Sequence, residues 1–466
     1  MVKSNIEEYI VDLEDLCKMF RLPENIVIEH TEVSEGNLFQ DKFVYHEAEQ
    51  RTEYNFSFTL NDEFTALHKK SYRKRMVKNF LYSILSKKLN KNLPWGSLTG
   101  VRPTKFAREL IAYGEMKEHL VSEMLQKDYF VSPEKAHLVA MILKNQKGII
   151  RNDNLVDLYI NIPVCPSRCL YCSFISSEYS MVKDKLESYI DAMIKELDAV
   201  KDIMKERVYL VRNVYIGGGT PSVLSAEQLD RLLSQINFPI TEFTVECGRP
   251  DTITREKLQV LKKHKVSRIS INPQTFCEAT LKRIGRKHKV GDVLNAYGMA
   301  LEEDFIVNMD IIAGLPGERF ATFKKTMTTL LELSPHNITV HTLSVKNGAQ
   351  LKDNTQLLSE KDITKMIDYS QKTLLENGYK PYYLYRQKNQ LCGLENVGYF
   401  RDEYLCAFNI DSMEETNTII GIGAGAISKR VYNLEKKITR ESNAKFIEDY
   451  IARIDEIIDK KKIFFK

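Results

Sequence analysis

The chain has 466 residues, of which 43% are hydrophobic and 28% charged, and it contains no low-complexity tract. This composition predicts two or three domains with buried cores and excludes a disordered protein. The net charge of +4 is unremarkable, no stretch approaches 18 uninterrupted apolar residues, and the N-terminus does not have the pattern of an export signal. Five of the eight cysteines are scattered singly, which is not typical of a secreted disulfide scaffold, so we expect a cytoplasmic protein.

The first 150 residues predict a separate N-terminal α+β domain. Three strand-like runs (NIVIEH, KFVYHE and YNFSFTL) come first, and helical stretches follow. In VSPEKAHLVAMILKNQ, Ser132 and Pro133 have the pattern of an N-cap and a first helical turn.

The segment 69–108 contains twelve Lys and Arg residues and no Asp or Glu. Apolar residues such as Met76, Phe80 and Ile84 recur at helical spacing between the cations, which favours a solvated helix face. The alternative is a surface for an anionic partner, such as nucleic acid, a membrane surface or a polycarboxylate ligand.

From residue 155 the pattern becomes an alternation of strands and helices. Six β-branched runs are separated by amphipathic segments of ordinary helix length, which indicates a parallel sheet of α/β class. The predicted strands are 156–162, 213–216, 242–247, 267–271, 305–312 and 337–343. Six units are fewer than the eight of a closed barrel, so the choices are a partial barrel or an open doubly wound sheet over 151–345. Residues 346–466 are predicted to be a C-terminal α/β extension that covers one side of the sheet.

Three cysteines, Cys165, Cys169 and Cys172, lie within eight residues directly after the first predicted strand. That loop belongs to the end of a βα sheet where ligands bind. Three thiolates do not complete a structural zinc site, whereas a cubane iron–sulfur cluster held by three thiolates keeps one iron open to a small ligand. The alternative, buried thiols in a core segment, fits poorly with the intervening Pro166 and Arg168.

Other predicted strand ends also carry glycine or polar residues. The sequence GGGTP (217–221) follows the second strand, and its glycines allow backbone amides to approach a ligand. Glu246 ends the third strand, Gln274 follows the fourth, and Asp310 lies late in the fifth. N-caps and turns would explain any one of these residues, but together they favour a binding site.

The CxxxCxxC spacing after a first strand resembles the radical S-adenosylmethionine (SAM) superfamily. The resemblance implies a partial (β/α)6 barrel whose [4Fe–4S] cluster binds the amino and carboxyl groups of SAM at its open iron. Reduction of the cluster then cleaves SAM to a 5′-deoxyadenosyl radical.

The wider series of motifs resembles the oxygen-independent coproporphyrinogen III oxidase family, and most closely its HemZ-type branch. The motifs are YINIPVCPSRCLYCSF, YIGGGTPS, TVECGRPD, RISINPQTF, LKRIGRKH, NMDIIAGLPGE and GIGAGAISK, together with SLTGVRPTK and PYYLYRQKNQ. The implied reaction is oxidative decarboxylation of coproporphyrinogen III propionates to vinyl groups, which gives protoporphyrinogen IX in haem biosynthesis. Its partners would be the tetrapyrrole substrate and an electron donor for the cluster.

The resemblance also implies roles for individual residues. Cys165, Cys169 and Cys172 would bind the cluster. The SAM site would be lined by Tyr159, Gly218, Gly219, Thr220, Glu246, Gln274, Arg286 and Asp310, with Tyr171 near the adenine. Tyr159 and Asn161 are the catalytic candidates. Without the family, Arg286 would be interpreted as one more solvated cation of the run KRIGRKHK.

The sequence departs from the family at three positions, with Asn161 in place of His, Val164 in place of Phe and Asn272 in place of Gly. Asn161 cannot titrate as His does, which argues against a proton donor to the substrate at this position. The segment GIGAGA superficially resembles a dinucleotide loop, but no βα unit with a following acidic residue surrounds it.

Substrate carboxylates would need cations, for which Arg102, Lys105 and Arg386 are the candidates. Two other functions stay open. One is haem binding or trafficking without decarboxylation, and the other is radical chemistry on another tetrapyrrole or on RNA. The N-terminal 150 residues lack a recognised RNA-binding motif, which argues against RNA.

Overall fold

The computed structural model describes residues 1–100, 102–149, 154–172, 177–344, 351, 358–387, 393–432 and 437–466. These residues form two compact units, Met1–Met141 (unit 1) and Ile142–Lys466 (unit 2). The predicted domain boundaries at 150/151 and 345/346 lie outside the described residues. No described helix combines the length and the apolar character that a membrane crossing requires.

Unit 1 is built on a four-stranded sheet in the order β1-β2-β3-β4, in which β1 is parallel to β2 and the other pairs are antiparallel. The elements are β1 (Val2–Ser4), α1 (Glu7–Phe20), β2 (Val27–Glu35), β3 (Leu38–Glu47), β4 (Gln50–Thr59), α2 (Ala66–Leu89), α3 (Pro103–Ala112) and α4 (Val121–Tyr129), and α5 (Pro133–Asn145) begins in unit 1 and ends in unit 2. Apolar side chains of the sheet, α1 and α2 form one core, with Phe43, Tyr82 and Leu85 among its most buried members. The three strand-like runs and the start of a helix at Pro133 agree with the sequence pattern.

Part of the basic segment is neutralised inside unit 1. Five cations of α2 form ion pairs with carboxylates from α1, β2, β3 and the turn after α3. The pairs are Lys70 with Glu8, Arg73 with Glu32, Lys74 with Asp12, Arg75 with Glu115 and Lys88 with Glu47. A helix whose cations are paired in this way presents much less net charge than its sequence suggests, which favours the helix-face interpretation.

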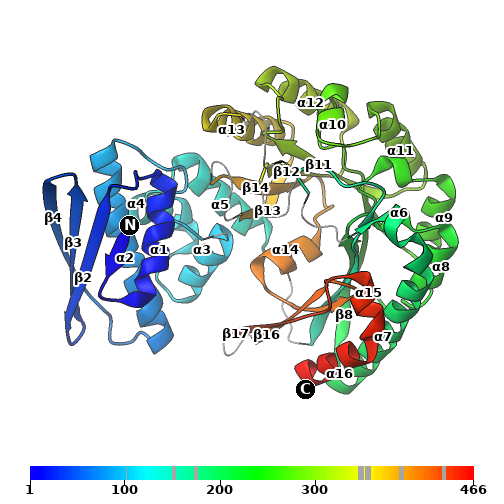
Figure 1. The fold of residues 1–466 in the computed structure, drawn as a ribbon, viewed down its shortest axis with the longest axis horizontal. Coiled ribbons are helices and arrows are strands. Elements are labelled where there is room, and N and C mark those ends of the chain that lie inside the picture. Colours follow the sequence, from blue (N-terminus) through cyan, green and yellow to red (C-terminus); the bar gives the residue numbers. More distant parts are fainter. Residues whose placement is uncertain are drawn as a thin grey trace. The chain divides into compact units, whose positions relative to one another are not determined.

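Unit 2 contains an eleven-stranded sheet in the order β13-β14-β12-β11-β10-β9-β8-β5-β15-β16-β17. Its centre is six parallel strands, β5 (Leu155–Ile162), β8 (Leu210–Gly218), β9 (Glu242–Glu246), β10 (Arg268–Ser270), β11 (Ile306–Ala313) and β12 (Asn337–Thr342). These are the six predicted strands, and each differs from its predicted bounds by three residues or fewer. The predicted α/β class and partial barrel are confirmed, because the sheet curves but ends in two edges, β13 and β17 (Figure 1).

The C-terminal region extends the sheet at both edges. At one edge β14 (Glu395–Phe400) runs antiparallel to β12, and β13 (Lys380–Arg386) pairs with β14. At the other edge β15 (Thr418–Ile422) runs parallel to β5 and is followed by β16 (Ile427–Tyr432) and β17 (Lys437–Ser442). The irregular sequence after 345 gives little sign of these short strands, because they pair only with distant partners, and the role of this region as a cover stays a prediction.

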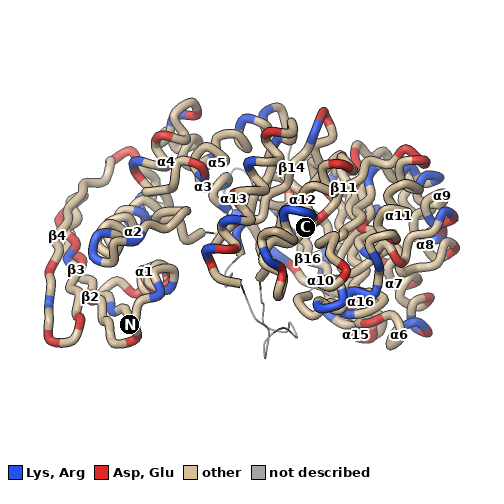
Figure 2. Tube along the Cα trace, turned by 90° about the horizontal axis from the view of Figure 1, so that it is seen from above, with Lys and Arg blue, Asp and Glu red and all other residues tan. Residues whose placement is uncertain are grey.

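Helices cover the outer face of this sheet (Figure 1). They are α6 (Tyr179–Val182), α7 (Leu186–Arg207), α8 (Ala226–Leu233), α9 (Arg255–Lys263), α10 (Glu278–Arg283), α11 (Val290–Glu302), α12 (Phe320–Leu333), α13 (Glu360–Glu376), α15 (Ile447–Ala452) and α16 (Ile454–Phe465). The α8 helix shows why such segments begin where they do, since Ser225 and Gln228 form a reciprocal capping box. Along these helices, Lys and Arg positions are interspersed with Asp and Glu positions (Figure 2).

The two faces of the parallel strands differ in chemistry because side chains alternate along a strand. In β5, Leu158 and Ile160 are fully buried, whereas Tyr159 and its neighbour Tyr215 in β8 stack on Phe408 of α14 (Ala407–Glu414). Helix α14 therefore lies against the inner face, opposite the outer helices (Figure 1). The inner face carries side chains with polar groups, among them the hydroxyls of Tyr159 and Tyr215.

Candidate functional site

The carboxyl ends of the parallel strands form one edge of the sheet, which we call the rim. Parallel strands bring these ends together, so residues far apart in the chain meet there. The glycine loop 217–221 follows β8, Glu246 ends β9, and Gln274 lies just beyond β10, where it pairs with Ile311 of β11. Asp310 lies in β11. The predicted strand-end residues therefore share the rim.

The cysteine loop is fixed to the glycine loop by backbone hydrogen bonds. Gly219 N donates to Ile162 O at 2.9 Å and Thr220 N donates to Val164 O at 2.8 Å. The Thr220 hydroxyl lies 3.2 Å from the Sγ of Cys165, the first cysteine. A Cβ at Gly219 would meet the carbonyl oxygen of Val164 at 2.5 Å. Only glycine permits this contact, so the loop sequence determines where the first cysteine lies.

The other two cysteines lie on a tight turn, in which Cys172 N donates to Cys169 O at 3.0 Å. The adjacent Leu170 N donates to Ile284 O at 3.1 Å, which ties the turn to the segment after α10. Within the described residues, no three His, Cys, Asp or Glu side chains converge closely enough to hold a single metal ion. A cubane distributes its thiolates over separate iron atoms, so its three ligands do not need to meet at one centre.

Arg286 is buried against the cysteine turn. Its guanidinium donates to Asn272 O at 2.5 Å and to Gly248 O at 3.2 Å. It also interacts with the Tyr171 hydroxyl and the Cys169 sulfur. The interpretation of Arg286 as a solvated cation is therefore wrong. The run KRIGRKHK looks solvated in sequence, but the chain turns after α10 and directs this one cation inward.

Glu246 receives two hydrogen bonds at the rim. The Tyr215 hydroxyl donates to its Oε1 at 2.6 Å, and the Gly218 N donates to its Oε2 at 3.2 Å. Loss of hydration raises the pKa of Glu246 to about 7, the hydrogen bond from Tyr215 opposes the rise, and the charge of Asp310 adds to it. Glu246 can therefore hold or release a proton near neutral pH.

The pKa of Asp310 is shifted in the opposite direction to that of Glu246. Burial acts to raise its pKa, but interactions with His341 and Asn308 outweigh burial and lower it. The Asn308 amide donates to Oδ1 at 2.8 Å, and the His341 Nε2 lies 3.6 Å from Oδ2. The other ring nitrogen of His341 lies 3.4 Å from the Tyr385 hydroxyl. Two neighbouring carboxyl groups with pKa values shifted in opposite directions are typical of a chemically active site.

Gln274 is held in a left-handed backbone conformation, with φ of 64°. Its backbone amide donates to Asp310 O at 2.9 Å, and its backbone carbonyl accepts from Ile312 N at 3.0 Å. Its side-chain oxygen is buried and has no hydrogen-bond partner among the described residues. A buried, unpartnered oxygen at a strained position suits a ligand donor, so the residues present at the rim fit a bound nucleoside.

Asn161 is held on both sides by the protein. Its amide donates to Ala424 O at 2.5 Å, and its side-chain oxygen accepts from the Tyr159 hydroxyl at 3.1 Å. A Cβ at Gly423 would meet the Asn161 carbonyl oxygen at 2.5 Å. The GIGAGA segment therefore supports the end of β5, and Asn161 acts as a structural link. The catalytic assignment of Tyr159 and Asn161 stays a prediction.

The three candidate carboxylate-binding cations lie in different environments. Arg102 precedes α3 and lines a cavity in unit 1, and Lys105 forms an ion pair with Glu109 at 3.9 Å. Arg386 ends β13 in unit 2 and is buried, and its Nε donates to Gly393 O at 2.9 Å. Burial lowers the pKa of Arg386 to about 10. Of the three, Arg386 alone lies in unit 2, at the carboxyl end of a strand.

Several inner-face residues were missed from the sequence, in particular His341, Tyr215 and Phe408. The alternation of side chains gave a usable signal for the first two. Tyr215 lies two residues before Gly217 of the glycine loop, so the two residues are on the same face of β8. His341 lies next to the carboxyl end of β12, which belongs to the rim. Phe408 comes from α14, and no local pattern indicates that this helix lies on the inner face.

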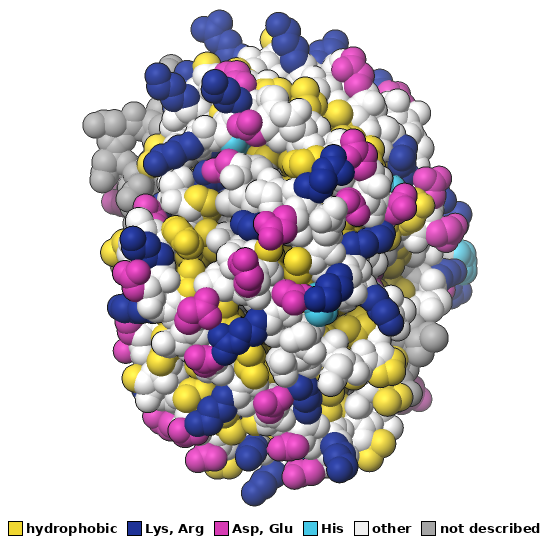
Figure 3. Space-filling view, turned by 90° about the vertical axis from the view of Figure 1, so that its right-hand side faces the viewer, with side chains coloured by type: hydrophobic (Ala, Val, Ile, Leu, Met, Phe, Trp, Pro, Cys, Tyr) yellow, Lys and Arg dark blue, Asp and Glu magenta, His cyan; other side chains and the backbone are white. Residues whose placement is uncertain are grey.

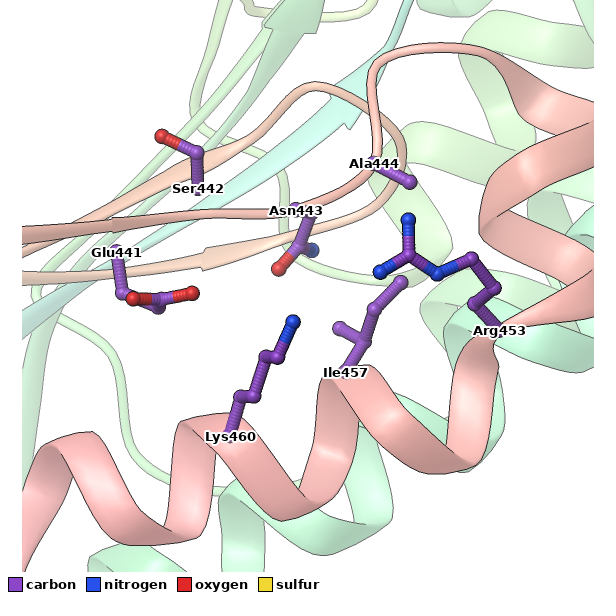
Figure 4. A pocket seen from close by; sticks show the side chains of 7 residues that line it. All are labelled: Glu441, Ser442, Asn443, Ala444, Arg453, Ile457 and Lys460. Carbon is purple, nitrogen blue, oxygen red and sulfur yellow. The ribbon is translucent and has the colours of Figure 1, made fainter.

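A cavity of about 240 Å³ lies away from these residues, between β17 and α16 (Figure 4). Arg453 and Lys460 border it, and both also pair with Glu456. Asn443, which also lines it, donates to Gly423 O and to Glu196. The cavity contains none of the predicted site residues.

Six parallel strands, a three-cysteine loop after the first and a glycine loop after the second define a radical SAM protein. The model of the radical SAM superfamily matches residues 159–330, and the chain belongs to that superfamily. It is 39% identical over 381 residues to the oxygen-independent coproporphyrinogen-III oxidase-like protein HemZ of Bacillus subtilis, covering 79% of this chain and 76% of that protein. The chain thus belongs to the coproporphyrinogen III oxidase-like family, in its HemZ-type branch, and its cofactors are a [4Fe–4S] cluster and SAM.

Two further comparisons place the chain within this group. It is 33% identical over 235 residues to the heme chaperone HemW of Lactococcus lactis, which covers 48% of this chain and 60% of HemW. The solved structure of coproporphyrinogen III oxidase (HemN) from Escherichia coli aligns with a TM-score of 0.53 and 22% identity over 69% of this chain and 72% of HemN. The fold is therefore that of HemN, while the relatives by sequence carry both oxidase-like and chaperone names.

Proposed function

We propose that the protein catalyses oxidative decarboxylation of coproporphyrinogen III propionates to vinyl groups. When bound, the cluster and SAM supply one-electron chemistry that removes a hydrogen atom from the propionate. Carbon dioxide and one electron then leave the substrate, and the electron passes to a one-electron acceptor. The group of relatives with oxidase-like names supports this choice of substrate.

The observation that carries the proposal is the combination of residues at one rim. The cysteine loop, the buried Arg286 and the unpartnered oxygen of Gln274 lie at the end of the sheet whose inner face carries stacked aromatic rings. We assign Cys165, Cys169 and Cys172 to the cluster. We assign the SAM site to Tyr159, Tyr171, Gly218, Gly219, Thr220, Glu246, Gln274, Arg286 and Asp310.

Each residue then has a physical task. The lowered pKa of Asp310 keeps it anionic, so it accepts hydrogen bonds from ligand hydroxyls. Glu246, with a pKa of about 7, donates or accepts according to its protonation. Tyr215 lies 4.4 Å from Phe408 between ring centroids, and these apolar surfaces exclude water and suit the pyrrole rings of the substrate.

A second function is favoured by a specific observation, the 33% identity to a heme chaperone. In that case the inner face would hold haem for transfer, and SAM cleavage would not be coupled to decarboxylation. The tyrosine side chains of the inner face, including Tyr383 and Tyr385, would suit haem as well as a porphyrinogen. The two functions differ in whether the substrate changes.

Anaerobic reconstitution with iron and sulfide, followed by SAM, a reductant and coproporphyrinogen III, tests the proposal. We expect 5′-deoxyadenosine and protoporphyrinogen IX in a fixed ratio. Cys169→Ala should lose the brown cluster absorbance and both products, whereas the matched control Cys277→Ala should keep them. Stable haem binding with no turnover of coproporphyrinogen would favour the chaperone function, and a brown Cys169→Ala variant would overturn the cluster assignment.

Radical chemistry on RNA receives less support. Five cations of α2 are paired within unit 1, and on the face shown in Figure 3 cationic and anionic side chains are interspersed. A nucleic-acid surface concentrates cations along one stripe. Steep salt dependence of RNA binding would reverse this ranking.

A further inference from the structure

Arg249, which has no task in the proposed reaction, is buried against the cysteine loop. It lies in the loop between β9 and a short 3-10 helix, η4 (Pro250–Thr252), and only 2% of the residue is exposed. One terminal nitrogen of its guanidinium, Nη1, donates to the carbonyl oxygen and to the hydroxyl of Ser167, each at 3.2 Å. Ser167 lies between Cys165 and Cys169. Arg249 therefore joins the loop after β9 to the part of the cysteine loop between these two thiols.

The other edge of the same guanidinium is paired with a carboxylate. Nε of Arg249 donates to Oδ1 of Asp251 at 3.0 Å and Nη2 donates to Oδ2 at 2.9 Å, which is the bidentate geometry that arginine forms with carboxylates. The side chain of Asp251 is 28% exposed, whereas that of Arg249 is 3% exposed. The pair is therefore ordered, with its positive end toward the cysteine loop and its negative end toward solvent.

Two neighbouring side chains influence the charge around this pair. Arg286 contributes a second buried guanidinium, which interacts with the Cys169 sulfur. The ring of His288 is buried, and its Nδ1 lies 4.0 Å from Oδ1 of Asp251. Burial, together with the charges of Arg286 and Arg249, lowers the pKa of His288 to about 3. This ring is therefore neutral at physiological pH and adds no charge.

A cubane at the cysteine loop responds to such charges when it gains an electron. Net charge, hydrogen bonds and solvent exposure set the reduction potential of an iron–sulfur cluster. A fixed cation beside the loop favours the reduced, more negative cluster, and burial of the cation keeps salt and water from screening this attraction. The charge of Arg249 acts on Cys165. The carboxylate of Asp251 opposes this effect from the far edge of the guanidinium.

We infer that Arg249 is a positioning residue of the cysteine loop that also raises the reduction potential of the cluster, and that Asp251 partly offsets its charge. The inference rests on the assignment of the cluster to Cys165, Cys169 and Cys172 proposed above, and it does not depend on the tetrapyrrole substrate. Arg249 thus acts on the electron that enters the cluster, whereas the other rim residues act on a bound ligand.

Redox titration of the reconstituted full chain, followed by the EPR signal of the reduced cluster, tests the inference. At the midpoint potential of the wild type, Arg249→Gln should lower the ratio of reduced to oxidised cluster by roughly threefold or more, because the carboxylate of Asp251 loses its cation. Asp251→Asn should raise the same ratio by roughly twofold or more, because the guanidinium is then uncompensated. The double variant Arg249→Gln/Asp251→Asn should lie between the two single variants. Arg255→Gln, which loses an exposed pair with Glu302, is the matched control and should keep the wild-type potential.

The opposite signs separate an effect of charge from a loss of structure. An ion pair with only a structural role would lower the cluster content of Arg249→Gln and Asp251→Asn alike without moving the potential of the clusters that form, and this result would overturn the inference. Arg249→Lys keeps the charge but cannot bond to both Ser167 and Asp251 as the guanidinium does. It should load less cluster than the wild type, while the potential of the loaded fraction stays near the wild-type value. If Arg249→Gln forms no cluster, an unchanged or lowered potential in Asp251→Asn overturns the inference.

The same measurements distinguish this inference from the proposed function. A wild-type chain that forms no brown cluster would overturn the cluster assignment and the inference with it. A chain that loads the cluster, shows the two opposite shifts and makes no protoporphyrinogen IX would support the inference while the proposed function fails.

Discussion

The two ends of the parallel strands in unit 2 carry similar residue types but use them differently. At the amino ends, Arg268 of β10 donates to Asn337 and to the carbonyl oxygens of Tyr404 and Leu405, each at 3.0 Å, and pairs with Glu242 at 2.8 Å. Glu242 in turn accepts hydrogen bonds from the backbone amides at the start of α14. These charges satisfy one another and hold α14 against the inner face.

A second cluster at the amino ends pairs two carboxyl groups. Asn213 donates to Asp157 at 2.8 Å and to Asp411 of α14 at 3.3 Å, and Arg212 pairs with Asp411 at 3.2 Å. Burial and the neighbouring charge of Asp411 raise the pKa of Asp157. This cluster joins β5, β8 and α14, although Asp157 Oδ2 and Asn213 Oδ1 have no hydrogen-bond partner among the described residues.

The rim carries a different set of polar groups. The Gln274 oxygen has no partner within the described residues, and the neighbouring carboxyl groups differ in protonation. One end of the sheet thus stabilises the fold, and the other carries the candidate binding residues. Unpartnered buried atoms occur at both ends, so the ends differ in what their charged groups contact. At the amino ends these groups bind α14, and at the rim they contact the glycine loop and the cysteine turn.

The largest loss of stability is expected for a variant at the amino ends of the parallel strands. Arg268→Ala should lower the free energy of unfolding of unit 2 by about 3–5 kcal/mol, because it removes the cationic partner of Glu242, whose side chain is only 12% exposed. Denaturant unfolding of the full chain measures this. Arg255→Ala, which breaks an exposed pair with Glu302, is the matched control and should leave the midpoint unchanged. Equal losses in the two variants would contradict the comparison.

Glu246 and Glu318 provide a matched pair, since burial is the leading cause that raises the pKa of each to about 7. An unfolded glutamate ionises near its usual 4.5. Between these pH values the folded state keeps a proton that the unfolded state has lost, so stability falls as the pH rises from about 4.5 to 7.

Each Glu→Gln variant should therefore gain about 1–3 kcal/mol of stability at pH 8 relative to wild type, and little at pH 4. Denaturant midpoints at the two pH values measure the gain. Only Glu246→Gln should also weaken SAM binding to the reconstituted protein, because Glu318 bonds to Thr275 behind the rim. Loss of SAM binding in both variants would contradict the assignment of Glu246, and not Glu318, to the SAM site.

Gln274→Leu should change stability and binding in opposite directions. Removing an unpartnered buried oxygen should leave stability unchanged or raise it by up to about 1 kcal/mol. The same change should weaken SAM binding about three- to tenfold, because the ligand loses one hydrogen bond. Equilibrium dialysis with the reconstituted protein tests this, and unaltered SAM affinity would remove Gln274 from the site.

The smallest effect is expected far from both ends. A Cβ at Gly298 in α11 would meet nothing within 4 Å, so Gly298→Ala should raise the unfolding free energy by about 0.5–1 kcal/mol through helix propensity. SAM cleavage should be unaltered. A loss of stability would show that the outer helices pack more tightly than the structure indicates.

Much of the fold could be predicted, because the central strands are short β-branched runs between amphipathic helices. The cluster loop could also be predicted, since its three cysteines are local in sequence. The edge strands could not, because β13 to β17 acquire their order only from pairing with β12 and β5. The burial of Arg286 was missed for the same reason, since its partners Gly248 and Asn272 lie on other loops.

The sequence by itself determined the residues with chemical capacity: three close thiols, a glycine loop and polar strand ends. Only the tertiary structure decided which of them are left for a ligand. Interaction partners come from distant segments, so the ion-paired Arg268 and the unpartnered side-chain oxygen of Gln274 look alike in sequence. The same holds for Asn161, a catalytic candidate through the family resemblance, whose assignment stays a prediction. Only the fold brings it the contacts with Ala424 and Tyr159, because these come from a distant segment and from the strand geometry of β5.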